Sequence, residues 1–387
     1  MAFRIDKLGA LILVLAIYGV LSPFVTLRAN RIVAGEGVGL PAALPYGSGW
    51  LLLLLIVGAA LTALLRKEPR PRLVAASVAV AALLVGAGLS ADFLTPPDNP
   101  YARVSPSVGF WVLVFTFALL ATDGVSRWNP RPAMRLVFLM LAIGLLLLVL
   151  VSGIWADLSV MKEYAARADV FWMEAARHLL LALGSLVAAT IAGLPLGILC
   201  ERIPAVRSAV LNTLNLVQTI PSIALFGILI GPLGWIAANV PGAHAIGVRG
   251  IGAAPAFVAL FLYSLLPVVA NTVAGLASVP RESRTAARGL GMTSTQRLLR
   301  VEFPLALPVI LTGIRIVLVQ NIGLATIAAL IGGGGFGTFV FQGLGQTATD
   351  LVLLGALPTV ALAFVCAVVL DAVIEMSRAL PARKETR

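Results

Sequence analysis

The stretch Leu136–Val151 reads LVFLMLAIGLLLLVLV and holds neither a charged residue nor a proline. A helix needs about 20 mostly apolar residues to cross the roughly 30 Å of hydrocarbon in a bilayer. Together with its flanking residues, this stretch therefore predicts one membrane-spanning helix. Similar runs occur along the whole chain and predict about ten spans, near 8–27, 48–65, 72–90, 106–123, 134–154, 178–200, 206–230, 256–279, 305–330 and 351–376.

The composition of the whole chain agrees with an integral membrane protein. Of its 387 residues, 60% are hydrophobic and only 12% are charged. Soluble domains carry about 25% charged residues, because their surfaces face water. The net charge of +11 could suggest nucleic-acid binding, but the basic residues lie between hydrophobic runs and form no long cluster. We therefore expect an all-α polytopic membrane protein that binds membrane lipid and no nucleic acid.

The distribution of Lys and Arg predicts the orientation in the membrane. If the N-terminus is cytoplasmic, the cytoplasmic segments hold about three times as many of the 28 basic residues as the outer segments. This bias agrees with the positive-inside rule. We therefore expect both termini to be cytoplasmic.

Proline divides the predicted spans into two groups. The first five have no proline in mid-span, whereas each later span contains or begins with one. Proline bends a helix and frees a carbonyl, which a membrane tolerates only where protein or water can satisfy it. Broken helices of this kind are typical of the moving core of transporters. We expect a five-helix accessory bundle at 1–155, an outer interfacial helix at 156–177 and a five-helix working core at 178–380; the prolines are Pro195, Pro221, Pro267, Pro308 and Pro358.

The largest cytoplasmic loop, 279–304, reads VPRESRTAARGLGMTSTQRLLRVEFP. Pro280 suits the first turn of a helix, and Gly291 can supply the left-handed residue that ends it. Thr293 and Gln296 then form a capping box that opens a second helix through Val301. The spacing predicts a helix–turn–helix on the inner membrane face. An ordinary solvated basic loop is the simpler alternative.

This loop resembles the cytoplasmic signature of ABC-importer permeases, which is Glu-Ala-Ala, three residues, Gly, nine residues and Ile-x-Leu-Pro. All spacings match, but Thr285 replaces the acidic residue, Val301 replaces Ile and Phe303 replaces Leu. Thr285 has no charge and cannot form the salt bridge that an acidic residue could form at this position. The matching positions predict an ATPase-coupling loop, with candidate residues Arg284, Thr285, Ala286, Ala287, Arg288, Gly291, Thr293, Gln296, Val301 and Pro304.

Three further stretches are similar to the glycine betaine/choline/osmoprotectant permeases. They are QTIPSIALFGIL (218–229), GIGAAPAFVALFLYSLLPVVANTVAGL (250–276) and IGGGGFGTFVFQGL (331–344). The resemblance covers about 178–376, and the N-terminal extension resembles a longer subgroup of the same family. It implies a type I ABC-importer permease core that moves a small quaternary amine across the bacterial inner membrane by alternating access.

The resemblance also implies the partners. The permease itself is not an enzyme and has no catalytic residues; a separate ABC ATPase subunit hydrolyses ATP, and the sequence has no G-x-x-x-x-G-K-[ST] loop. The other implied partners are a second permease protomer, identical or related, an extracytoplasmic substrate-binding protein and the small amine.

No cofactor or metal is expected. The glycines of 332–337 formally satisfy G-x-G-x-x-G, but a spanning helix precedes them where a dinucleotide site needs a strand. His178 and His244 have no His, Asp or Glu neighbour at ligand spacing. We expect a flexible turn at the outer side for the glycines and interfacial packing for both histidines.

Polar residues inside the core spans are costly in lipid and face protein or a cavity. They can line the path of the amine, where a cation can also meet the face of an aromatic ring. They can equally form hydrogen bonds between helices. The sequence leaves both roles open for the pathway candidates Gln218, Thr219, Pro221, Ser222, Tyr263, Asn271, Gln320 and Asn321.

Arg315 is the one basic residue deep in a predicted span. Asp371 and Glu375 reach a similar depth on the last span, one helical turn apart on one face. We expect Arg315 to pair with Asp371 or Glu375, with Asp371 favoured because it lies deeper. The alternative is that Arg315 extends to the inner headgroups along its aliphatic stem.

A secondary transporter driven by an ion gradient is the alternative function. Such a protein predicts an inverted repeat and carboxylates near the midplane. No repeat is evident, and the carboxylates of the core spans, Asp371 and Glu375, lie toward the cytoplasmic end of the last span. A membrane scaffold is the third class, but it does not need a proline in every core span.

Overall fold

The computed structural model describes residues 6–31, 33–99 and 101–382. The two chain ends, which the sequence predicts to be cytoplasmic, lie outside these residues. The chain divides into two compact units, Met1–Ala166 and Arg167–Arg387. Within the described residues, nine helices are long and apolar enough to span a membrane, and Lys7–Leu21 is a shorter apolar helix. The prediction of a helical protein with about ten spans is confirmed.

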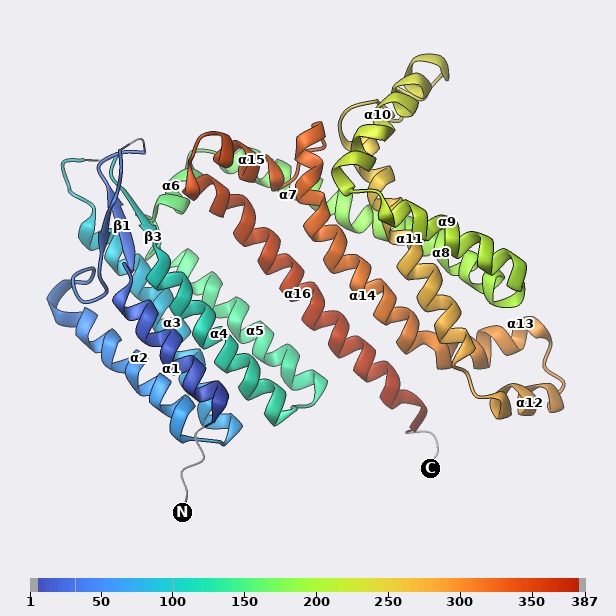
Figure 1. Ribbon diagram of the computed structural model, residues 1–387, viewed down its shortest axis with the longest axis horizontal. Helices are drawn as coiled ribbons and strands as arrows, with labels where there is room; N and C mark the ends of the chain where they lie inside the picture. Colours follow the sequence, from blue (N-terminus) through green and yellow to red (C-terminus); the bar gives the residue numbers. More distant parts are fainter. Residues whose placement is uncertain (1–5, 32, 100, 383–387) are drawn as a thin grey trace. The chain divides into compact units, whose positions relative to one another are not determined.

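The first unit is a bundle of apolar helices (Figure 1). Helix α1 packs against α2 and α4, and α3 packs against α4. Small residues allow these close approaches: a Cβ atom on Gly9 of α1 would lie 2.4 Å from the Ala63 carbonyl oxygen of α2. The helices are α1 (Lys7–Leu21), α2 (Ser48–Leu65, after the 3-10 turn η1, Pro45–Gly47), α3 (Pro69–Leu94), α4 (Val108–Trp128), α5 (Pro132–Val151) and α6 (Ser159–Ala165).

A small sheet between these helices adds to the predicted helical fold. Strands β1 (Val25–Arg28), β2 (Glu36–Val38) and β3 (Arg103–Pro106) form an antiparallel sheet in the order β2-β1-β3. The strands lie in the loops after α1, before α2 and before α4. Each is only three or four residues long, which is too short for a recognisable alternation of apolar and polar residues.

A buried ionic cluster joins four helices at one end of this bundle. Arg72 of α3 is fully buried and pairs with Asp6, which caps α1, and with Asp123 of α4 at 2.8 Å. It also donates to the carbonyls of Ala63 and Arg66 at 2.7 Å each, at the end of α2. Arg127 of α4 pairs with the same two carboxylates from a more exposed position. Two arginines and two aspartates thus balance their charges.

The second unit is built around α11 (Ala253–Ala277). It packs against α8 (Ser185–Arg202) and α14 (Phe303–Ile327), and α14 packs against α16 (Thr349–Ala382). At one end of α14 lie the 3-10 turn η4 (Ala328–Ile331) and α15 (Gly337–Gly345); at the other lie α12 and α13 (Figure 1). The remaining elements are α7 (Ala168–Leu179), the π-helix η2 (Leu180–Gly184), α9 (Pro204–Thr219), α10 (Ser222–Asn239), α12 (Arg281–Gly289), α13 (Ser294–Arg297) and the π-helix η3 (Leu298–Glu302).

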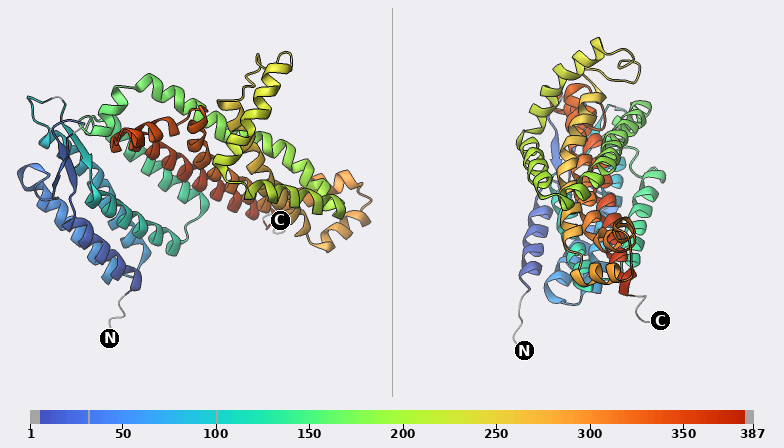
Figure 2. Two further views of the ribbon diagram at one scale, coloured as in Figure 1. Left: turned by 45° about the horizontal axis from the view of Figure 1, so that its top comes forward. Right: turned by 90° about the vertical axis from the view of Figure 1, so that its right-hand side faces the viewer.

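The predicted span 206–230 is wrong as a single helix. Helix α9 ends at Thr219, and α10 begins at Ser222 and extends away from the other helices of its unit (Figure 2). The ring of Pro221 forces the preceding residue out of the helical region, and Ile220 accordingly has an extended backbone with ψ 126°. Pro221 therefore divides this segment into two helices.

The predicted helix 156–177 is also divided. Helix α6 ends at Ala165 and α7 begins at Ala168, because Arg167 between them leaves the helical region with φ −141° and ψ 26°. Helix α7 then continues through η2 into α8, so the predicted connecting helix and the first core span share one continuous run.

Candidate functional site

The loop 279–304 folds as two capped helices. Gly291 has φ +74°, and its N–H donates to the Arg288 carbonyl while the Met292 N–H donates to the Ala287 carbonyl. These two bonds satisfy carbonyls at the end of α12. Thr293 caps α13, and the Gln296 side chain accepts from the Thr293 N–H. The predicted left-handed glycine and capping box are both confirmed.

The sequence predicted that the second of these helices ends at Val301, but in the structure it continues beyond that residue. Helix α13 passes through η3 directly into α14, so residues 294–331 form one helical run from the loop into the membrane. A π-turn within a helix is uncommon and often occurs at functional positions. Helix α13 is thus joined to the spanning helix α14 without an intervening loop.

The surface of the helix pair is largely exposed. Ala287 is 3% exposed and holds α12 in place. The other signature residues of α12 and of the turn face outward, and Leu290 beside them is 78% exposed. The exposed positions are Thr285, Ala286, Arg288, Gly291, Thr293 and Gln296, whereas Arg284 and Val301 are half-buried and Pro304 is exposed.

Glu302 is the residue of this loop that the sequence analysis missed. Its side chain is buried and lies near Arg297 of α13 at 2.8 Å, Arg202 of α8 at 3.5 Å and Arg284 of α12 at 3.8 Å. Glu201 of α8 contacts the same Arg284 at 3.4 Å. Glu302 stands in the last motif of the loop, but no local pattern indicates its partner Arg202, which is 100 residues away.

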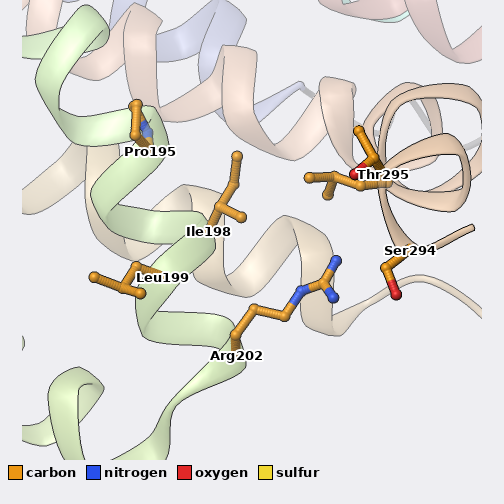
Figure 3. Close-up of a pocket in the computed structure, with 7 residues that line it drawn as sticks. Pro195, Ile198, Leu199, Arg202, Ser294 and Thr295 are labelled. Atoms are coloured by element: carbon orange, nitrogen blue, oxygen red, sulfur yellow. The ribbon is translucent and has the colours of Figure 1, made fainter.

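A surface cavity of about 340 Å³ opens beside this cluster (Figure 3). Arg202 points from α8 toward the segment that carries Ser294 and Thr295, and apolar side chains of α8 form the opposite wall. The cavity therefore separates the end of α8 from the start of α13. Its lining residues are Pro195, Ile198, Leu199, Arg202, Ser294, Thr295 and Leu298.

Two pathway candidates, Gln218 and Tyr263, donate hydrogen bonds to backbone carbonyls near prolines. Pro267 has no N–H to donate to the Tyr263 carbonyl one turn earlier, and the Gln218 side chain of α9 donates to that carbonyl at 2.9 Å. The Tyr263 hydroxyl in turn donates to the Ile220 carbonyl at the break before α10. Gln218 and Tyr263 thus connect the broken segment to α11.

Asn321 is the centre of a second polar contact. It is fully buried on α14 and donates to the hydroxyls of Ser185 and Ser264, both at 2.9 Å, on α8 and α11. Asn271 donates to the Pro267 carbonyl at 2.8 Å, and Thr219 to the Leu216 carbonyl at 2.7 Å. These three candidates bond between or within helices.

The remaining candidates occupy less defined positions. Gln320 is half-buried next to Asn321, Ser222 is half-buried and Pro221 is exposed. Among the pathway candidates, bonds between elements are therefore made by Gln218 and Tyr263 and by Asn321.

Arg315 and Asp371 form an ion pair between α14 and α16. The two side chains are 38% and 46% exposed in the isolated chain. Glu375 lies one turn further along α16 and is half-buried. The charge within α14 thus has a carboxylate partner on the last helix.

The other end of the unit carries a second buried carboxylate that the sequence analysis missed. Glu174 of α7 accepts from the Gly335 N–H at 2.5 Å and pairs with Arg177 at 2.9 Å. Gly334 and Gly335 have φ near +80°, so the glycine-rich segment forms a turn that Glu174 holds in place. His178 packs at 4.9 Å from the Phe336 ring, which agrees with a packing role. The described residues contain no group of His, Cys, Asp and Glu that could hold a metal ion.

Two family matches together cover most of the chain. Residues 193–379 match the family "Binding-protein-dependent transport system inner membrane component", and residues 6–161 match "ABC transporter permease YehY, N-terminal domain". The boundary between the matches falls close to the boundary between the two compact units.

Several curated proteins are similar to the second unit. The osmoprotectant import permease protein OsmW of Salmonella typhimurium is 46% identical over 49% of this chain and 83% of its own length. The carnitine transport permease protein OpuCB of Listeria monocytogenes is 37% identical over 49% of this chain and 79% of its own. The glycine betaine/carnitine/choline permease protein OpuCB of Bacillus subtilis is 37% identical with the same coverage.

Among solved structures, an inward-facing MetNI methionine ABC transporter aligns over 55% of this chain and 95% of its own, with 22% identity and a TM-score of 0.46. The family matches, together with the long apolar helices, define a permease subunit of an ABC importer, a multi-pass protein of the inner membrane. The chain belongs to the osmoprotectant import permease family.

Proposed function

We propose that this chain is the transmembrane subunit of an ATP-driven importer that moves a small quaternary amine, such as glycine betaine, choline or a related osmoprotectant, by alternating access. The observation that carries this proposal is the pair α12–α13, which is capped at its turn, exposed on its surface and continuous with α14. The printed names of the relatives, which include osmoprotectant, carnitine, glycine betaine and choline permeases, support the substrate class.

The partners follow from this role. A separate ABC ATPase subunit docks on α12–α13, an extracytoplasmic binding protein delivers the amine to the opposite face, and a second permease protomer completes the pathway. The loop 279–304 and both termini are cytoplasmic in this arrangement. Residues 178–380 form the working core, and residues 1–155 form an accessory bundle.

The polar groups around Tyr263 and Asn321 lie along the path of the amine in this account. A proline leaves a backbone carbonyl without its usual donor, and a side chain from a neighbouring helix can donate to it instead. Such a bond can break and form again during a conformational cycle. Gln218 at Pro267 and Tyr263 at Ile220 are bonds of this kind.

Substitution of Gly291 tests the docking element. Proline at this position would replace φ +74° with about −65° and remove the N–H that donates to Arg288, so the turn between α12 and α13 cannot form. Gly291→Pro should insert normally but lose co-purification with the ATPase subunit and lose amine uptake. Gly289→Ala is the matched control, because an added Cβ there meets open space. Parental uptake by Gly291→Pro would contradict the assignment.

A further inference from the structure

The carboxylate of Glu302 lies where four helices of the second unit meet. It is the last residue of the π-turn η3, between α13 and the spanning helix α14, and its side chain is 3% exposed. Its three arginine neighbours come from α8, α12 and α13. A buried carboxylate is costly unless it is paired, so these contacts fix how the four helices meet.

The three contacts are unequal. Arg297 Nε lies 2.8 Å from Oε1 of Glu302 and forms a hydrogen bond, whereas Arg284 Nε lies 3.8 Å from the same oxygen. Within the described part of the chain, Arg284 Nε is buried and has no hydrogen-bond partner. A buried donor without an acceptor is unfavourable, because it has lost its bonds to water and gained none in the protein. A shift of α12 by less than 1 Å toward Glu302 would satisfy it.

The surroundings of the cluster are not fully packed. A cavity lies beside Arg202, between the end of α8 and the start of α13 (Figure 3). The outer surface of α12, in contrast, is exposed and available to a partner. A force applied to α12 therefore acts directly on the Arg284–Glu302 contact.

We propose that Glu302 is the positioning residue that couples the loop helices to the spanning helices: movement of α12 brings Arg284 onto Glu302, and the closed cluster displaces α8 and α14 together. Glu302 acts through these arginines and touches no substrate. This inference rests on the proposed function, because the force on α12 comes from the ATPase subunit.

The test measures the number of ATP molecules hydrolysed per amine transported by the complete importer in proteoliposomes. Glu302→Gln removes the charge and retains the shape, and it should raise this ratio about tenfold, the effect of one charge-assisted hydrogen bond on an equilibrium. Glu302→Asp retains the charge and should restore part of the coupling. Glu68→Gln is the control, since Glu68 is exposed at the start of α3 in the first unit, outside the proposed docking pair, and should leave the ratio unchanged.

If Glu302→Gln does not fold, Arg284→Gln provides the same test, because Glu302 then keeps Arg202 and Arg297. A raised ratio with this variant supports the proposal. If a folded variant hydrolyses as much ATP per amine as the parental importer, the proposal is overturned, even if the melting temperature of the variant is lower. A parental complex without ATP-driven uptake contradicts the proposed function instead, so the two failures are distinguishable.

Discussion

The buried arginine of the first unit gives the sharpest stability prediction. Arg72 of α3 is 0% exposed and contacts two carboxylates and two backbone carbonyls that belong to three other helices. Breaking a buried ion pair by removing one partner destabilises a protein by about 3–5 kcal/mol, because the other charges remain buried. In a unit of this size 1 kcal/mol corresponds to about 2–4 °C, so Arg72→Ala should lower the melting temperature by roughly 6–20 °C.

Arg127 provides the matched control. It contacts the same Asp6 and Asp123, but its side chain is 41% exposed. Exposed pairs contribute about 0–1 kcal/mol, so Arg127→Ala should lower the melting temperature by at most about 4 °C. The assay is thermal unfolding of the purified chain in detergent. Equal effects of the two substitutions would refute the argument from burial.

The same cluster predicts a pH dependence. Burial raises the pKa of the Asp6 carboxyl, but the hydrogen bond and charge of Arg72, the Leu8 N–H and the charge of Arg127 together hold it below its ordinary value. A carboxyl with a lowered pKa in the folded state contributes stability above its unfolded pKa, and this stability is lost as the pH falls through the folded pKa. The parental chain should therefore lose stability from about pH 4 downward, and Arg72→Ala should lose less over this range.

Two further substitutions test contacts within the second unit. Gln218→Leu leaves the Tyr263 carbonyl without its donor and should lower the free energy of unfolding by about 1–3 kcal/mol, measured by thermal unfolding. Thr219 is exposed and bonds only within α9, so the control Thr219→Val should change this free energy by less than about 0.5 kcal/mol. Similar effects of the two substitutions would show that Gln218 does not compensate for Pro267. Arg315→Ala and Asp371→Ala should be non-additive by about 1 kcal/mol in a double-mutant cycle, and simple addition would show that the pair contributes nothing.

Local sequence signals predicted local structure well. The turn between α12 and α13 depends on Gly291, Thr293 and Gln296, which lie within six residues of one another, so its geometry could be deduced from their order. The depth of Arg315 and Asp371 in their spans likewise follows from counting residues along two helices. Both inferences need only the dimensions of a helix and the chemistry of its ends.

Contacts between distant segments could not be predicted in this way. Arg72 lies 66 residues from Asp6 and 51 from Asp123, and Gln218 lies 45 residues from the carbonyl that it satisfies. The span 206–230 was predicted as one helix because it is apolar over its whole length. Pro221 restricts the backbone of Ile220 to extended conformations, and this local effect was not used to divide the span. Hydropathy detects which segments enter the membrane, and it does not show where a helix breaks inside it.

ATP-driven amine import is tested most directly by uptake of labelled glycine betaine, choline and carnitine into proteoliposomes that contain this chain, its ATPase subunit and its binding protein. We expect at least one amine to accumulate when ATP is present on the side of the ATPase, and uptake to stop without ATP or with Gly291→Pro. Uptake that continues without ATP and follows an imposed ion gradient would rule out an ATP-driven importer and identify a secondary transporter.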